Sequence, residues 1–180
     1  MSQVKLQGNA GGSGSVTIAA PNTNSAYTVT LPAATGDVMV SGNMPAFSAY
    51  AGATTSVTTG TFTKVALNTT DFDTNSYFDK TTNYRFTPLV AGYYQINASV
   101  QMNTTSQSVL CTIYKNGSAY CWGVGGYSSS LSATSVATAL IYCNGSTDYI
   151  ELYCYQGTGE TLNANSGIYT RLSGSMVRAA

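Results

Sequence analysis

Residues 92–102 carry the feature that most constrains the fold, because apolar and polar side chains alternate there at every second position. Successive side chains of a β-strand point to opposite faces, so this period places one set of residues on each face. One face takes Tyr94, Ile96, Ala98, Val100 and Met102, and the other takes Tyr93, Gln95, Asn97, Ser99 and Gln101. The pattern predicts an antiparallel strand with one face on a core and the other face in water.

The same period of two recurs between turn-forming residues along the rest of residues 45–180. Asn116-Gly117 and Asn144-Gly145 are favourable hairpin turns. We expect further strands within residues 62–67, 109–113, 137–143, 149–155 and 168–172. No segment has a convincing 3.6-residue period. About eight short strands separated by Gly, Asn and Ser turns predict an all-β fold, a β-sandwich of the jelly-roll type.

Residues 1–44 are expected to form a separate N-terminal arm and β-hairpin. Residues 15–20 and 27–31 alternate, residues 21–25 between them are rich in turn formers, and Pro32 would end the second strand. An isolated hairpin is marginal in water, so this one would need neighbouring strands from sister chains or from a docking partner. We therefore predict an anchor over residues 1–44 and a jelly-roll head over residues 45–180.

The chain has few charged residues, and their number and distribution exclude several classes of partner. Only 8% of the residues are charged, and seven scattered basic residues balance seven acidic ones. Binding to a phosphate backbone needs clustered basic residues, so nucleic acid is not an expected partner. Residues 1–15 lack the apolar run of a secretory leader, and no stretch approaches the roughly 18–20 apolar residues of a transmembrane helix. We expect no membrane insertion, and release within an assembled virus particle is one route out of a cell.

The four cysteines, Cys111, Cys121, Cys143 and Cys154, do not indicate a metal site. No CxxC pair occurs and histidine is absent, which excludes the usual zinc patterns. Two disulfides remain open. The alternative is that Cys111, Cys143 and Cys154 are small hydrophobic residues of buried strands.

Several short segments follow one another in the order of a known family. They are PAFSA at residues 45–49, FTKV at 62–65, YFD at 77–79, FTP at 86–88, AGYY at 91–94, IYKNG at 113–117 and LSGSM at 172–176. In this order they resemble the complement C1q-like globular head, a jelly roll of the tumour-necrosis-factor (TNF) superfamily. Asn83-Tyr84-Arg85 stands where the family has a glycine, and the closing strand lacks the family's phenylalanine.

The resemblance implies a C1q/TNF-like head that assembles as a homotrimer and serves adhesion, ligand recognition or particle decoration without catalysis. The front segment, residues 14–40, resembles short β segments of bacteriophage tail fibres and capsid fibres. Together the two resemblances imply a protein on the surface of a phage virion, assembled in the host cytoplasm. Its N-terminal segment would then bind a capsid or tail protein.

Four tyrosines are candidates for a trimer interface. If the strand registers hold, Tyr93, Tyr114, Tyr142 and Tyr153 lie opposite the inferred core residues. Monomers rarely expose large apolar patches, and aromatic residues are enriched in interface cores. We predict that these tyrosines form a threefold interface, and the alternative is four ordinary surface tyrosines with solvated hydroxyls.

Two long loops, residues 120–133 and 156–167, are candidates for receptor binding. They are rich in Ser, Gly, Asn and aromatic residues, a composition typical of adaptable recognition surfaces. The residues that would contact a host-surface glycan or protein are Tyr120, Trp122, Tyr127, Asn163 and Asn165. The same composition equally suits an inert surface.

Asp71, Asp73 and Asn75 form a weak calcium candidate. They place oxygen ligands at alternate positions, as the front of a calcium loop does. The glycine and the distal glutamate that complete that motif are missing, so a capped turn is the alternative. Apart from this hypothesis, no cofactor is expected.

Catalysis is not expected either. Histidine is absent, which removes the usual base of a Ser/His or Cys/His site. A glycosidase needs two carboxylates that face each other, whereas Asp148 and Glu151 flank a hairpin turn, where solvated charge is usual. A depolymerase would require such a carboxylate pair in a groove.

The predicted function is that of a non-catalytic, homotrimeric capsid-decorating knob or short head fibre. It would stabilise the particle, attach it to the host surface, or do both. A receptor-binding tail fibre tip remains an alternative. A free adhesin or lectin-like module of a cellular organism is another.

Overall fold

The computed structural model describes residues 10–15, 17–19, 21–30, 33, 36, 38–103, 109–126, 132–158 and 162–180. The chain divides into two units, residues 1–36 and residues 37–180. We call the second unit the head.

The N-terminal unit has no strand among its described residues. Ile18, Tyr27 and Val29, which belong to the two predicted hairpin strands, are 81%, 75% and 86% exposed. The predicted hairpin is therefore absent from the described part of this unit. Two short strands bury too little apolar surface to hold themselves together without a third strand or a partner.

The described part of the head consists of β-strands and two 3₁₀ turns. They are β1 (Ala46–Tyr50), β2 (Thr55–Val57), β3 (Thr63–Lys64), β4 (Thr69–Asp73), β5 (Phe78–Asp79), β6 (Arg85–Phe86), β7 (Ala91–Met102), β8 (Val109–Lys115), β9 (Ser118–Trp122), β10 (Val124–Gly126), β11 (Ala133–Asn144), β12 (Ile150–Gln156), β13 (Leu162–Ala164) and β14 (Arg171–Ala179), with η1 (Ser41–Asn43) and η2 (Gly167–Tyr169). No helix in the part of the chain that the structure describes is long and apolar enough to span a bilayer.

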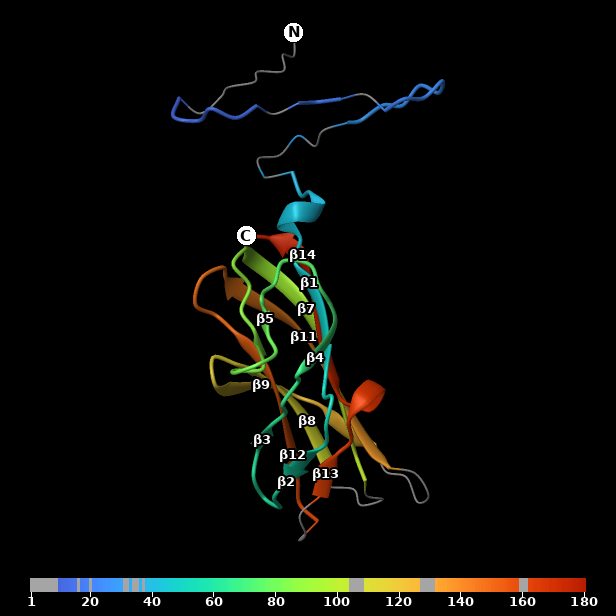
Figure 1. Cartoon of the computed structure of the whole chain (residues 1–180), viewed down its shortest axis with the longest axis vertical. Coiled ribbons are helices and arrows are strands. Elements are labelled where there is room, and N and C mark those ends of the chain that lie inside the picture. The colour runs from blue at the N-terminus through green and yellow to red at the C-terminus, as the bar shows by residue number, and fades with distance from the viewer. Residues whose placement is uncertain are drawn as a thin grey trace. The chain divides into compact units, whose positions relative to one another are not determined.

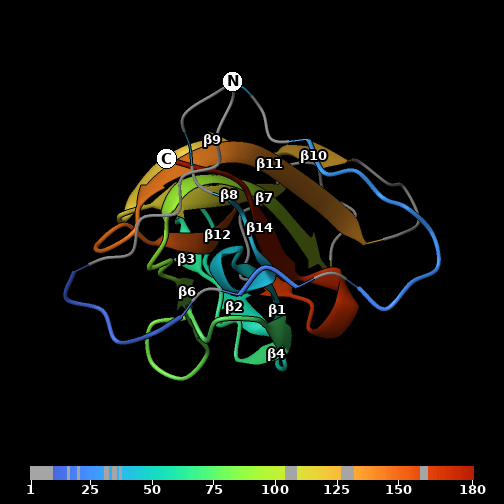
Figure 2. The ribbon, with the colours of Figure 1, turned by 90° about the horizontal axis from the view of Figure 1, so that it is seen from above.

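These strands form two antiparallel sheets (Figures 1 and 2). The larger sheet has the order β10-β11-β7-β14-β1-β4, and β13 pairs with both β7 and β2. The smaller sheet has the order β5-β6-β12-β8-β9, and β3 pairs with β12. Strands distant in the chain lie side by side, such as β7 next to β14 and β1 next to β14. The prediction of an all-β jelly-roll sandwich is confirmed.

The core between the sheets follows the predicted alternation. Along β7 the residues Tyr94, Ile96, Ala98, Val100 and Met102 are all buried. At one end of the core the Phe47 ring stacks on Phe86, with ring centroids 4.2 Å apart, and on Phe78 at 5.3 Å. Cys111, Cys143 and Cys154 are buried and carry no disulfide, as the alternative for the cysteines predicted.

Glycines at two places fix how the strands meet. Asn116 and Gly117 both have positive φ, 52° and 76°, as a two-residue hairpin turn requires and as the Asn-Gly pair predicted. At Gly92 an added Cβ would lie 2.4 Å from the carbonyl oxygen of Arg178 on β14. Only glycine therefore allows β7 and β14 to approach each other at this point.

Candidate functional site

The outward face of the larger sheet carries exposed apolar side chains. β7 and β11 pair without interruption over their whole length, which sets Tyr93 directly opposite Tyr142. The two tyrosine rings lie 5.4 Å apart. We call the following residues, each 39–58% exposed, the large-sheet face: Tyr93, Val136, Leu140, Tyr142 and Val177.

The middle of this face contains uncharged polar side chains that bond to one another. Thr138 on β11 accepts a hydrogen bond from Gln95 Nε2 at 2.8 Å, and its hydroxyl bonds to Asn97 Oδ1 at 2.9 Å. A partner could cover this part of the sheet without burying an unpaired charge, which is the composition expected of an interface core.

An ion pair lies on the same sheet, on the strands beyond β7. Arg171 on β14 contacts the carboxylate of Asp71 on β4, and Ser48 on β1 donates to that carboxylate at 2.9 Å. The Arg171 side chain is 37% exposed and the Asp71 side chain 44%, so the pair is partly solvated. The charges of this cluster neutralise each other.

The three weak calcium candidates each contact protein groups. Asp71 pairs with Arg171. Asp73 accepts hydrogen bonds from the backbone N–H groups of Tyr77 and Phe78, at 3.2 and 2.8 Å, and thereby caps a turn. Asn75 donates to the carbonyl of Gly42 at 3.2 Å. Among the described residues, no group of three or more His, Cys, Asp or Glu side chains could hold a metal ion.

The outward face of the smaller sheet carries a row of contacting aromatic rings. Tyr114 on β8 stacks on Tyr153 on β12, with ring centroids 3.9 Å apart. Phe62, just before β3, lies 5.0 Å from the Tyr155 ring, 5.4 Å from the Trp122 ring and 6.1 Å from the Tyr114 ring. We call Phe62, Tyr114, Trp122, Tyr153 and Tyr155 the aromatic patch.

The structure thus divides the four tyrosines predicted for a trimer interface into two pairs. Tyr93 and Tyr142 lie on the larger sheet, and Tyr114 and Tyr153 lie on the smaller one. The two sheets enclose the core between them, so the pairs point away from each other. No single flat surface of one head contains all four.

The candidate receptor-binding residues lie in strands more than in loops. Tyr120 and Trp122 belong to β9 and are 50% and 59% exposed. Asn163 belongs to β13, and Tyr127 lies outside the described residues. Asn165 follows β13, where its backbone N–H and its side-chain amide bond to Gln101 at 2.7 and 3.0 Å. Among the described candidates, Tyr120 and Trp122 therefore lie on the smaller sheet, whereas Asn163 and Asn165 lie at β13 of the larger sheet.

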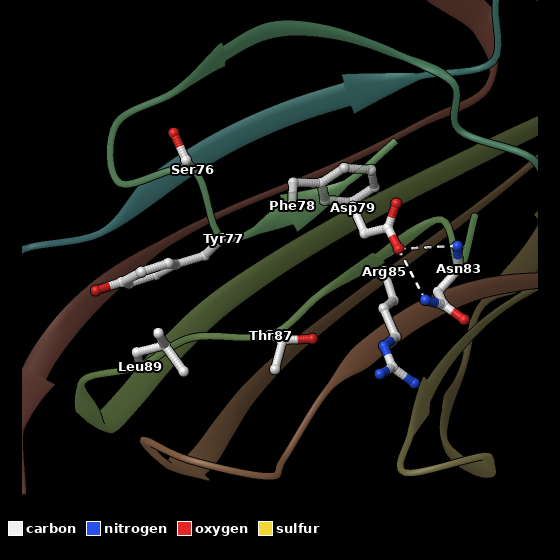
Figure 3. A pocket seen from close by; sticks show the side chains of 8 residues that line it. All are labelled: Ser76, Tyr77, Phe78, Asp79, Asn83, Arg85, Thr87 and Leu89. Atoms are coloured by element: carbon white, nitrogen blue, oxygen red, sulfur yellow. Dashed lines mark hydrogen bonds between the residues drawn. The ribbon is translucent and has the colours of Figure 1, made fainter. Parts of the chain in front are cut away.

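A shallow pocket opens beside β5 and β6 (Figure 3). It is lined by Ser76, Tyr77, Phe78, Asp79, Asn83, Arg85, Thr87 and Leu89. The Asp79 carboxylate accepts hydrogen bonds from the backbone N–H groups of Thr82, Thr81 and Asn83 and from the Asn83 side chain. The bonds from Thr82 and Thr81 hold the pKa of Asp79 far below its usual value. This carboxylate closes a turn and is a poor proton donor or acceptor at neutral pH.

The two carboxylates near the β11–β12 hairpin are not solvated, so that expectation was wrong. Glu151 is 4% exposed and pairs with Lys64, and Asp148 is 8% exposed and pairs with Lys115 at 2.9 Å. The expectation failed because it considered only the local turn, whereas Lys64 comes from a distant strand. Each of the two carboxylates therefore has a cationic partner.

Burial raises the pKa of the Cys143 thiol to about 11 and that of the Cys154 thiol to about 12. Both thiols are therefore unreactive at neutral pH.

The sequence-based predictions named Tyr93 and Tyr142 of the large-sheet face, and Tyr114, Tyr153 and Trp122 of the aromatic patch, and missed the other members of both. They omitted Val136 and Leu140, although Val136, Leu140 and Tyr142 alternate with the inward residues Ala139 and Ile141. Apolar residues on both faces of one strand were the signal, because such a strand is covered on both sides. Phe62 has no comparable signal, since its contacts with β9 and β12 are non-local.

Comparisons with known proteins identify the fold. No family model and no curated protein matches the sequence. Murine APRIL, at pH 5.0, matches with a TM-score of 0.57 and 11% identity, over 74% of this chain and 99% of that one. Eiger TNF from S. frugiperda matches with a TM-score of 0.54 and 7% identity, over 76% and 93%. The PRD1 vertex protein P5 matches with a TM-score of 0.51 and 19% identity, over 74% and 97%.

These likenesses show that the head has the jelly-roll fold of the TNF and C1q-like proteins. Proteins with this fold commonly trimerise, and they are typically binding or structural modules without catalytic activity.

Proposed function

We propose that this chain is a non-catalytic surface protein of a bacteriophage particle. Its head forms a homotrimer through the large-sheet face, and its N-terminal unit attaches to a capsid or tail protein. The trimer decorates the particle as a knob or short fibre and stabilises it, binds the host cell surface, or does both.

The observation that carries the proposal is the large-sheet face. Five apolar side chains are exposed on neighbouring strands, around polar groups that already bond to one another. A soluble monomer rarely leaves such a surface in water, whereas a threefold interface would bury it. The fold supports this assembly because TNF-like proteins commonly trimerise.

Two observations support a place on a virion. The vertex protein of phage PRD1 has a similar fold. In the N-terminal unit, Ile18, Tyr27 and Val29 are exposed along short alternating segments that resemble those of phage fibres. An alternating segment of this kind can pair with strands of a partner and bury these side chains there.

The trimer is tested by the native mass of the full chain in light scattering. We expect three times 18.8 kDa for the wild type and 18.8 kDa for Leu140→Lys, because the lysine would place three charges within the interface. Leu89→Lys is the matched control, since Leu89 is exposed to a similar degree, 58% against 53%, but lies outside the large-sheet face. A monomeric wild type at micromolar concentration would contradict the proposal.

The location is tested separately, with an antibody against the head applied to purified phage particles. Labelling of the capsid or tail surface is the expected result. A chain found only free or on cells would favour the free adhesin.

A further inference from the structure

The aromatic patch covers a polar group that has no hydrogen-bond partner. Thr112 on β8 lies directly opposite Tyr153 on β12 and Trp122 on β9, so its side chain shares the outward face with those two rings. Its Oγ1 is fully buried, and it is the one buried side-chain nitrogen or oxygen in the described residues that lacks a partner. A buried hydroxyl without a partner is costly, so such a group in a native fold calls for an explanation.

Phe62 contacts rings on both strands that flank Thr112, namely Tyr155 on β12 and Trp122 on β9. It comes from the β3 edge of the sheet, yet it contacts the Trp122 ring on the opposite edge strand and the Tyr114 ring between them. Thr112 lies on β8, between β12 and β9, so the Phe62 ring is the group placed to cover its hydroxyl. Phe62 precedes a strand of only two residues and is partly exposed, so a rotation of this side chain would open a small site with aromatic walls and a hydroxyl at its floor.

The charge of the patch is already neutralised. Lys64 and Glu151 lie next to Tyr153 and Tyr114 in the register, and they pair with each other. The hydroxyls of Tyr114 and Tyr153 are protonated at neutral pH, as in any tyrosine, and burial raises their pKa values further. They can therefore donate hydrogen bonds. The complementary ligand has no net charge, an apolar surface for the rings and hydroxyls for the polar atoms.

We propose that the aromatic patch is a binding site for a neutral glycan. A pyranose ring presents a face of C–H groups that packs on aromatic rings, and its hydroxyls can bond to Thr112 Oγ1 once Phe62 moves aside and to the tyrosine hydroxyls at the rim. The inference develops the host-binding part of the proposed function by naming the ligand class. It uses the smaller sheet, which the proposed trimer leaves free.

The chain supplies its own probe for this site, because Trp122 is its one tryptophan. Titration of the full chain with neutral oligosaccharides, such as gluco-, galacto-, manno- and N-acetylglucosamine oligomers and neutral bacterial O-chains, should change the Trp122 emission in a saturable manner. Sialylated and uronic-acid oligosaccharides are the comparison series. Absence of saturable change with every neutral glycan overturns the inference, as does a response confined to the acidic series.

Thr112→Val separates a binding role from a structural one. Valine has nearly the shape of threonine and removes the unpaired hydroxyl, so the free protein should be as stable as the wild type or more stable. Glycan affinity should nevertheless fall about tenfold, because the ligand loses a buried hydrogen bond. Unchanged glycan affinity in Thr112→Val would show that the Thr112 hydroxyl does not contribute to binding.

Tyr155→Ala tests the wall of the site and Tyr169→Ala is its matched control, since the exposed Tyr169 side chain lies at η2 away from the patch. Only Tyr155→Ala should weaken binding. The proposed trimer and the proposed glycan site can be refuted independently of each other. If the Leu140→Lys monomer still binds glycan, the glycan site stands without the trimer. If the wild type is a trimer but binds no neutral glycan, the proposed assembly stands and the glycan site is refuted.

Discussion

Tyr94 shows at the scale of one residue how a polar group is kept in an apolar core. Its ring is fully buried between the sheets, and its hydroxyl donates to the Val90 carbonyl at 2.7 Å. Burial raises the pKa of this phenol well above its usual value, so the group stays neutral and acts as a donor. The bond fixes the segment that enters β7.

Tyr94→Phe should therefore lower the free energy of unfolding by about 1–3 kcal/mol, because it leaves the Val90 carbonyl without its donor. The measurement is urea unfolding at neutral pH. Tyr169→Phe, on an exposed ring, should stay within about 0.5 kcal/mol of the wild type. Equal stabilities of the two variants would show that the hydroxyl of Tyr94 does not hold that loop.

At the scale of elements, two hairpin connections are joined through one carboxylate. Asp148, between β11 and β12, accepts hydrogen bonds from Asn116 Nδ2 at 2.7 Å and from the backbone N–H of Asn144 at 3.0 Å, and it pairs with Lys115. Asn116 in turn accepts from the backbone N–H of Tyr149 at 2.9 Å. Burial acts to raise the pKa of Asp148, but the bonds from Asn116 and Lys115 lower it below its usual value.

Asp148→Asn should lower the free energy of unfolding by about 1–3 kcal/mol at neutral pH, because it breaks charge-assisted bonds. The folded-state pKa of Asp148 is depressed, so its contribution is present above the usual value of 3.8 and is lost as the pH falls below it. The difference between wild type and variant should therefore shrink in unfolding curves taken at successively lower pH.

Asp71→Asn is the comparison for this clamp. Its ion pair with Arg171 is partly solvated, so the loss should be below about 1 kcal/mol. An Asp148→Asn deficit that persists unchanged at low pH would assign the loss to packing and not to the charge.

The elements also show where prediction from sequence ends. The alternation in β7 and the Asn-Gly turn after β8 depend on neighbouring residues, and both were predicted correctly. The prediction of a hairpin over residues 15–31 also depended on neighbouring residues alone. A strand needs a partner strand, however, and this unit supplies none among its described residues. Thr112 has the parity of an outward residue and is nevertheless buried, on a face where Phe62 contacts Trp122 across the sheet, and that contact is non-local.

At the scale of the whole molecule, the two units divide the work of the proposed function. Every described residue of the hydrophobic core lies in the head, from Met39 and Phe47 to Met176 and Ala179. The head also carries both the large-sheet face and the aromatic patch. The N-terminal unit contributes no described residue to this core, so attachment to the particle and stability of the head are separate properties in this arrangement.

Removal of residues 1–36 should consequently leave the head folded, with its unfolding midpoint unchanged in circular dichroism and its native mass still three times that of one shortened chain. Both proteins must be compared at equal subunit concentration, since association shifts the midpoint of an oligomer. A shortened chain that is stable but monomeric would show that the N-terminal unit, and not the large-sheet face, holds the trimer together. A chain that unfolds at lower temperature yet stays trimeric would mean that the N-terminal unit stabilises the head, and a fully retained trimer would leave that unit free to bind the particle.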